Sequence, residues 1–231
     1  MNKHSSNQEL FEYYNARASE YEEFYWGRSG ARIHDPELYT RETLTVRNLL
    51  PDLISGNCLD IACGTGFWLP VYEKNCTNIT LIDQSENVLV ECEKKVNLLR
   101  IKDKVEIVQD NLFTHDFKKK TYDCVLTGFL ISHFRFSELT EFLHLADNLL
   151  ISRGRLIIID STWNEEVASS GRTKIGTMSR MLSDGQEFSV YKRYFDQDDI
   201  DRMSDEHGLT VEFTFWGKVF FLVSAKFSRI R

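Results

Sequence analysis

Carboxylate side chains stand at the ends of three successive strand-like segments of this chain. Asp60, Asp83 and Asp110 belong to or directly follow the apolar segments 58–62, 78–83 and 105–109. The carboxyl ends of neighbouring parallel strands meet at one edge of a sheet, and ligands bind in the crevice outside that edge. We therefore expect the three carboxylates to face a single ligand.

The turn after the first of these segments contains Gly64 and Gly66. Glycine lets the backbone approach a ligand closely, and the helix that follows would point its N-terminal amides at the same place. Asp83 has the position of the carboxylate that accepts ribose hydroxyls at dinucleotide sites. Asp110 and Asn111 can hydrogen-bond an adenine edge, and the apolar residues after them can pack on its ring. The pattern predicts a nucleoside-containing ligand.

A nicotinamide-type dinucleotide site is the main alternative. Its fingerprint requires a third glycine three residues beyond the second, and that position is Leu69 here. An acidic side chain at Asp60 also suits a cationic or amine-bearing ligand better than a pyrophosphate. S-adenosylmethionine carries both an ammonium and a sulfonium, so the sequence favours it as the cofactor.

The rest of the chain alternates short apolar segments with longer amphipathic ones, which is typical of a parallel sheet covered by helices on both faces. Further strands are expected at 122–127, 155–160, 209–216 and 218–227, and helices at 85–100, 136–150 and 196–207. Ser137 is the expected N-cap of the second helix. Gly217 predicts a hairpin between the last two strands. The predicted fold class is α/β, a three-layer sandwich with a seven-stranded, mostly parallel sheet whose last strand is antiparallel.

We expect residues 1–231 to form a single domain with two additions to this sheet. Residues 1–50 read as a helical N-terminal lid, and residues 161–195 interrupt the alternation as an insertion over the ligand pocket. The alternating stretch 188–195 suggests an extra strand within the insertion. These additions would enclose a small acceptor molecule.

The motifs appear in the order found in one family. Five segments resemble the successive motifs of class I, Rossmann-like S-adenosylmethionine-dependent methyltransferases. In chain order they are LDIACGTGFW, LIDQSENVL, QDNLF, YDCVLTGFLISHF and LLISRGRLIIIDS. The upstream segment YYNARASEYEEFYW resembles the aromatic lid of the small-molecule branch. The resemblance covers about residues 10–160 and is specific for fold and cofactor, but much less so for the acceptor.

The resemblance implies roles for individual residues. The methionine part of the cofactor would lie against Asp60, Ala62, Cys63, Gly64 and Gly66, and its ribose against Asp83, Gln84 and Ser85. Adenine would lie against Asp110, Asn111 and Leu112. The sulfonium would have Thr127 and Phe129 beneath it, and Tyr14, Arg17 and Tyr21 would close over it. Tyr14 and Tyr21 could equally be helix-packing aromatics.

His133 is the candidate catalytic base, because it follows the fourth strand and imidazole titrates near neutral pH. The alternative is a histidine that is packed or hydrogen-bonded at the start of a helix. The candidate acceptor-binding residues of the insertion are Trp163, Arg172, Arg180, Arg193 and Tyr194. An arginine among them could clamp a carboxylate or phosphate of the acceptor, whereas the alternative is a solvated charged loop.

Composition narrows the remaining possibilities. The 231 residues carry a formal net charge of −7, which makes nucleic acid an unfavourable partner. The five cysteines lack C-x-x-C spacing and the histidines form no metal-binding pair, so we expect reduced thiols, a cytoplasmic location and no metal. Without an apolar run of membrane-spanning length, the expected partner is a small-molecule acceptor and the expected state a monomer or homodimer.

The predicted function is an S-adenosylmethionine-dependent methyltransferase that moves a methyl group to an oxygen or nitrogen of a small metabolite. One alternative is a methyltransferase acting on protein or RNA. Thr127-Gly128-Phe129-Leu130 disfavours nucleic-acid amines, because the element commonly used for them contains prolines. Another is a non-catalytic protein that holds the cofactor as a sensor or partner subunit, although every motif position is intact.

Overall fold

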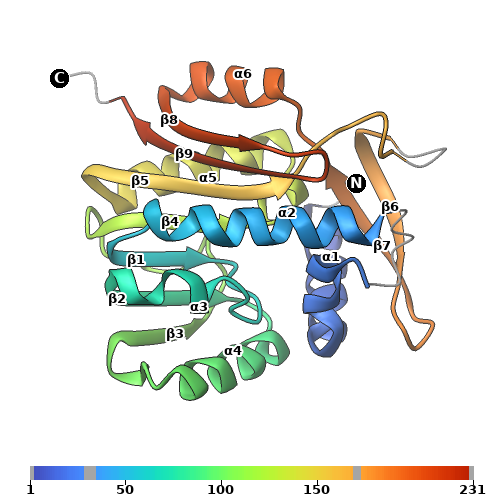
Figure 1. Cartoon of the computed structure of the whole chain (residues 1–231), viewed down its shortest axis with the longest axis horizontal. Coiled ribbons are helices and arrows are strands. Elements are labelled where there is room, and N and C mark those ends of the chain that lie inside the picture. The colour runs from blue at the N-terminus through green and yellow to red at the C-terminus, as the bar shows by residue number, and fades with distance from the viewer. Residues whose placement is uncertain (1–2, 29–34, 169–172, 229–231) are drawn as a thin grey trace.

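Seven strands form the central sheet of the computed structural model, which describes residues 3–28, 35–168 and 173–228 (Figure 1). The strand order is β3-β2-β1-β4-β5-β9-β8. The first five strands of that order pair in parallel, and β9 is antiparallel to both β5 and β8. The predicted sheet, including its antiparallel last strand, is confirmed.

The elements follow one another as the alternating pattern requires. The strands of the sheet are β1 (Gly56–Ile61), β2 (Cys76–Asp83), β3 (Val105–Gln109), β4 (Tyr122–Gly128), β5 (Leu150–Ser161), β8 (Leu209–Trp216) and β9 (Phe220–Phe227). The α-helices are α1 (Lys3–Ala16), α2 (Pro36–Leu49), α3 (Leu69–Tyr72), α4 (Glu86–Leu99), α5 (Phe136–Leu149) and α6 (Gln197–His207). Short 3-10 helices are η1 (Ala18–Trp26), η2 (Leu50–Asp52), η3 (Glu73–Asn75), η4 (Lys102–Lys104) and η5 (Ile131–His133).

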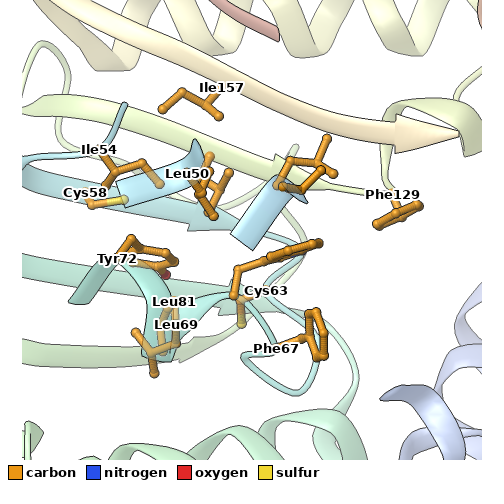
Figure 2. Close-up of a cluster of buried hydrophobic side chains, with 14 of the residues drawn as sticks. Leu50, Ile54, Cys58, Cys63, Phe67, Leu69, Tyr72, Leu81, Phe129 and Ile157 are labelled. Carbon is orange, nitrogen blue, oxygen red and sulfur yellow. The ribbon is translucent and has the colours of Figure 1, made fainter. Parts of the chain in front are cut away.

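Two hydrophobic clusters, one on each face, hold the helices to the sheet. Side chains of α2, α3 and α4 pack on one face, and side chains of α5 and α6 pack on the other. Figure 2 shows the first cluster, in which Tyr72 of α3 lies among Leu50, Cys58 and Leu81 from η2, β1 and β2. Because both faces are covered, the central parallel strands β1 and β4 are largely apolar and buried, and the carboxyl ends of the parallel strands remain the accessible edge.

Side-chain caps define several helix ends. The Asp35 carboxylate accepts a hydrogen bond from Leu38 N at 2.9 Å just before α2. Asp196 caps α6 in the same way, and Gly208 ends it with a φ of 63°, as the sequence predicts. The predicted N-cap of α5 is wrong: the helix begins at Phe136, so Ser137 lies within its first turn.

A buried carboxylate joins the N-terminal region to the final hairpin. Glu42 of α2 is 6% exposed and accepts three backbone N–H bonds, from Lys218 at 2.7 Å and from Val219 and Phe220 at 3.0 Å. Gly217 leaves space for this carboxylate, since a Cβ there would lie 2.2 Å from its Oε2. Val219 and Phe220 are buried, so their amides would be unsatisfied without Glu42.

A second, two-stranded sheet stands at the carboxyl edge of the first. It consists of β6 (Ile175–Met181) and β7 (Glu187–Arg193), which pair antiparallel. Figure 1 shows it beside α1, and α1 contacts β7 directly. The extra strand expected at 188–195 corresponds to β7, whereas β6 was not predicted. No helix in the described ranges is both long and apolar enough to cross a membrane.

Candidate functional site

One pocket opens at the carboxyl ends of β1, β2, β3 and β4, and α1 and η1 cover it. Twelve of the residues predicted to form the site line this pocket: Tyr14, Tyr21, Ala62, Gly64, Asp83, Gln84, Ser85, Asp110, Asn111, Leu112, Phe129 and His133. They come from segments that are far apart in the sequence. The structure therefore brings most of the predicted site together.

The turn after β1 presents its backbone to the pocket. Ala62, Gly64 and Gly66 have φ values of 55°, 55° and 70°. A Cβ on Gly64 would lie 3.2 Å from Cζ of Tyr21, so this residue must lack a side chain for the lid to close on the turn. Ala62 holds the same left-handed conformation with a Cβ attached, which is strained for a non-glycine residue.

Asp83 is fixed at the end of β2 by backbone donors. Its Oδ2 accepts a hydrogen bond from Gly64 N at 3.0 Å, and its Oδ1 accepts one from Ser85 N at 2.9 Å. Burial raises the pKa of this carboxyl, and the N–H groups of Ser85 and Gly64 partly offset the rise. Each carboxylate oxygen has a second lone pair, which leaves Asp83 able to accept from ligand hydroxyls.

Asp110 is the exposed counterpart at the end of β3. Its Oδ1 accepts a hydrogen bond from Asn111 N at 2.7 Å, and its Oδ2 lies 2.9 Å from Nδ1 of His115. These two bonds, that of His115 first, lower the pKa of the Asp110 carboxyl. Asp83 and Asp110 thus face the pocket as hydrogen-bond acceptors with fixed orientations.

Asp60 does not line the pocket. It is 3% exposed, and the hydroxyl of Tyr72 donates a hydrogen bond of 2.7 Å to its Oδ2. Burial raises the pKa of Asp60 to about 7, although the Tyr72 hydroxyl lowers it in part. The expectation that three carboxylates face the ligand holds for Asp83 and Asp110, while Asp60 lies behind the pocket wall.

Three other predicted cofactor residues also lie behind the wall. Cys63, Gly66 and Thr127 are buried and are not part of the lining. Gly66 packs against α4, since a Cβ there would lie 2.9 Å from Sγ of Cys92. Among the described residues, Thr127 Oγ1 has no hydrogen-bond partner. These residues shape the turn and the strand from behind.

The N-terminal lid contributes aromatic and aliphatic side chains. Tyr14 and Tyr21 line the pocket, together with Leu10 and Phe11, which were not predicted. The signal for Leu10 and Phe11 was their spacing of three to four residues from Tyr14, which places all three on one side of a helix. Arg17, also predicted, is 9% exposed and lies over the rings of Tyr14 and Tyr21 at 5.9 and 5.3 Å from their centroids.

His133 is held by a hydrogen bond at each ring nitrogen. Its Nδ1 lies 2.8 Å from the Tyr191 carbonyl oxygen, and its Nε2 lies 2.7 Å from the Tyr14 hydroxyl. A carbonyl only accepts, so Nδ1 carries the proton and Nε2 accepts from Tyr14. Burial, and then the charges of Lys192, Arg180 and Arg17, lower the pKa of His133 well below its usual value. The imidazole is therefore neutral near pH 7.

A buried ion pair that sequence reasoning did not assign lies beside His133. Nζ of Lys192 is 3.4 Å from Oδ1 of Asp160 and donates a 2.6 Å hydrogen bond to Oγ of Ser132. The Asp160 carboxylate also accepts from the backbone N–H groups of Ser132 and Ser161, at 3.0 and 2.7 Å. These residues are too far apart in the chain to form any local motif.

The predicted acceptor residues of the insertion have different positions. Trp163 and Tyr194 have ring centroids 6.1 Å apart, and Arg180 Nη2 lies 3.5 Å from the Tyr194 hydroxyl. Arg193 pairs with Asp199 of α6 at 2.9 Å, and none of these four predicted residues is part of the pocket lining. Arg172 lies outside the described residues.

Comparison with known proteins identifies the enzyme class. Residues 59–158 match the family model described as a methyltransferase domain. Residues 59–158 therefore carry a methyltransferase domain. The predicted enzyme class, a methyltransferase, is thereby confirmed. No curated protein matches the sequence.

Solved structures show the same fold as this methyltransferase. A DhpI-SAM-HEP complex has a TM-score of 0.77 and 20% identity, with 98% of this chain and 100% of that chain covered. An S-adenosylmethionine-dependent methyltransferase from Clostridium acetobutylicum has a TM-score of 0.64 and 15% identity, with 94% and 99% covered. The glycopeptide N-methyltransferase MtfA, complexed with S-adenosylmethionine, has a TM-score of 0.61 and 16% identity, with 80% and 93% covered.

Proposed function

We propose that this methyltransferase transfers the methyl group of S-adenosylmethionine to an oxygen or nitrogen atom of a small molecule. The observation that carries the proposal is the cover over the pocket. Tyr14 and Tyr21 close its N-terminal side, and β7 packs against α1 next to His133. A pocket enclosed in this way suits a small acceptor better than a folded protein or an RNA duplex.

The residues of the pocket suit the parts of the cofactor. Asp83 would accept hydrogen bonds from the ribose hydroxyls, and Asp110 and Asn111 would bind the adenine edge, with Leu112 against the ring. Arg17 is buried without an acidic partner among the described residues, so it suits the methionine carboxylate. When bound, the cofactor supplies a methyl group that its sulfonium already activates.

The protein's contribution is orientation and exclusion of water, because the methyl group needs no further activation. We propose that the N-terminal region, residues 1–50, forms the lid over the cofactor, and that the insertion, residues 161–195, forms the lid over the acceptor. Phe129, at a φ of 59°, and Thr127 would lie beneath the reacting centre at the end of β4. Closure of both lids would align an acceptor lone pair behind the methyl carbon.

His133 is the proposed base for an acceptor that carries a proton. Its neutral imidazole has the unprotonated Nε2 directed at the Tyr14 hydroxyl, on the wall of the pocket. An acceptor hydroxyl that displaced Tyr14 from this nitrogen could transfer its proton there. Asp160 and Lys192 would act as positioning residues, since they hold Ser132 next to His133.

Binding of S-adenosylhomocysteine, the product form of the cofactor, tests the proposal. In calorimetric titrations, we expect Asp83→Ala to weaken binding by about tenfold or more, because it removes a fixed acceptor for two hydroxyls. The matched control is Asp205→Asn, which changes an exposed carboxylate of α6. Absence of binding to the wild-type protein, or equal affinities of the two variants, would contradict the proposed site.

A further inference from the structure

Positive charge gathers on the side of the pocket that faces the β6–β7 hairpin. Arg17 of the N-terminal region, Arg180 of β6 and Lys192 of β7 all act electrostatically on His133, whose ring lines the pocket. The carboxylate of Asp160 pairs with Lys192. Two guanidinium groups are thus left without an acidic partner in the described part of the chain.

Three neighbouring glutamate side chains accept hydrogen bonds from backbone amides and do not pair with these guanidinium groups. Glu9 and Glu20 accept hydrogen bonds from the backbone of the hairpin, at Ser189 N and Ser183 N. Glu138, on the pocket wall, accepts from Arg135 N at the start of α5. Within the described residues, none of the three lies within ion-pair distance of Arg17 or Arg180.

Arg17 is more deeply buried than Arg180 and therefore requires a counter-ion more strongly. Its Nη1 donates to the Tyr13 hydroxyl at 2.6 Å, its Nε has no partner among the described residues, and three tyrosine rings surround its guanidinium. A guanidinium has five N–H donors, and a buried charge without a counter-ion is costly. Tyr21 contacts both Arg17 and the glycine turn after β1. The single carboxylate of the cofactor would therefore pair with Arg17.

Arg180 then remains as a guanidinium that the cofactor does not neutralise. It lies on the inward, half-buried face of β6, directly opposite Phe188 of β7. Its nitrogens make only long contacts to neutral groups, 3.4 Å to the Ser179 carbonyl, 3.5 Å to the Tyr194 hydroxyl and 3.6 Å to Sδ of Met178.

The hairpin directs this guanidinium toward the acceptor side. Arg180 reaches along the strand to Tyr194, and the same Tyr194 ring lies 5.7 Å from Nζ of Lys192. Arg180 and Lys192 therefore share Tyr194 as a neighbour, and both charges act on His133.

We propose that the methyl acceptor is an anion, and that Arg180 binds its carboxylate or phosphate-type group beside Lys192 and His133. This proposal rests on the proposed function and adds the chemical class of the acceptor to it. Arg180 would form a bidentate contact, since its planar fork matches both kinds of oxyanion. Its exposed half gives such an acceptor a route into the pocket from the hairpin side.

The test uses the full-length protein saturated with S-adenosylhomocysteine. Inorganic phosphate and acetate are titrated separately into the wild-type protein, Arg180→Gln and the control Arg153→Gln, which changes an exposed arginine of β5. We expect the preferred anion to bind to the wild type and the control alike, and about tenfold more weakly to Arg180→Gln. The stronger of the two titrations distinguishes a phosphate-type group from a carboxylate.

The variants also separate the two proposals. S-adenosylhomocysteine should bind to all three proteins with affinities within about twofold of one another, because Arg180 is assigned to the acceptor. If it binds and neither anion does, or if Arg180→Gln binds the anions as the wild type does, the anionic acceptor is overturned while the proposed function stands. If S-adenosylhomocysteine does not bind to the wild type, both proposals are overturned.

Discussion

The pocket is built from two halves that differ in charge and in construction. The strand-end half consists of Ala62, Gly64, Asp83 and Asp110, which follow consecutive strands of one parallel sheet. The hairpin half consists of His133 of η5, which lines the pocket, and of Arg180 and Lys192 of the small sheet, which lie near His133. The first presents carboxylates and backbone, and the second presents cations.

This difference suggests a division of labour between the halves. The carboxylates of the strand-end half complement the hydroxyls and positive charges of an adenosyl-sulfonium ligand, and their positions depend on the sheet alone. The hairpin half depends on contacts between elements that only the complete fold brings together. It can therefore change its acceptor without disturbing the cofactor site.

The largest expected effect concerns the buried ion pair of the hairpin half. Lys192→Met leaves the Asp160 carboxylate buried without its cation, and we expect the free energy of unfolding to fall by about 3 kcal/mol. Lys192 is 7% exposed, and burial lowers the pKa of its ammonium group. Denaturant unfolding followed by circular dichroism measures the change.

The control for this variant makes the same substitution in a surface ion pair. Lys226 pairs with Glu212, and both side chains are about one-third exposed, at 33% and 34%. Lys226→Met should change the free energy of unfolding by less than about 1 kcal/mol. Equal losses in the two variants would mean that the hairpin half does not depend on its buried pair.

A second prediction concerns Asp60, behind the strand-end half. Its pKa of about 7 in the folded protein exceeds that of an unfolded aspartate, so the folded state retains a proton that the unfolded chain releases. The stability contributed by this group is present below pH 4 and is lost as the pH rises toward 7. Asp60→Asn cannot ionise and avoids this loss.

The pH dependence of unfolding tests the role of Asp60. The unfolding free energy of Asp60→Asn, relative to the wild type without ligand, should rise by about 2 to 3 kcal/mol between pH 5 and pH 8. Asp205→Asn, in an exposed position of α6, should follow the wild type throughout. Parallel curves for Asp60→Asn and the wild type would show that burial does not perturb Asp60.

The smallest expected effect concerns the backbone of the strand-end half. Ala62→Gly removes the strain of a left-handed alanine, and the greater freedom of glycine in the unfolded chain offsets part of the gain. We expect a net stabilisation of about 0.5 kcal/mol, measured as a rise in Tm. Ala16→Gly, at the exposed end of α1, should not stabilise, and a fall in Tm for Ala62→Gly would show that the turn tolerates alanine without strain.

The sequence predicts the strand-end half well, because its signals are local. Each strand is a short apolar run, and Asp83 and Asp110 stand where such runs end. The strands of the sheet and the cap of α6 follow from the same kind of pattern. Asp60 was misplaced at the pocket wall, because the sequence does not show that Tyr72, from a helix four residues long, reaches its carboxylate.

The hairpin half could be predicted only in part. His133 lies in a motif that resembles the family's, but Lys192, Asp160 and Ser132 meet through tertiary packing that no spacing in the sequence encodes. The strand β6 was missed because IGTMSRM is largely polar and contains a glycine, so its alternation is weak. Its pairing with β7 provides what its own composition does not.

The clasp between Glu42 and the turn before β9 has a consequence for synthesis of the chain. During translation, α2 is synthesised long before residues 218–220. The Glu42 carboxylate therefore lacks its three amide donors until these late residues have been made. An N-terminal fragment that ended before this turn would leave the Glu42 carboxylate without these three amide donors. The last hairpin thus supplies hydrogen bonds that α2 lacks until late in synthesis.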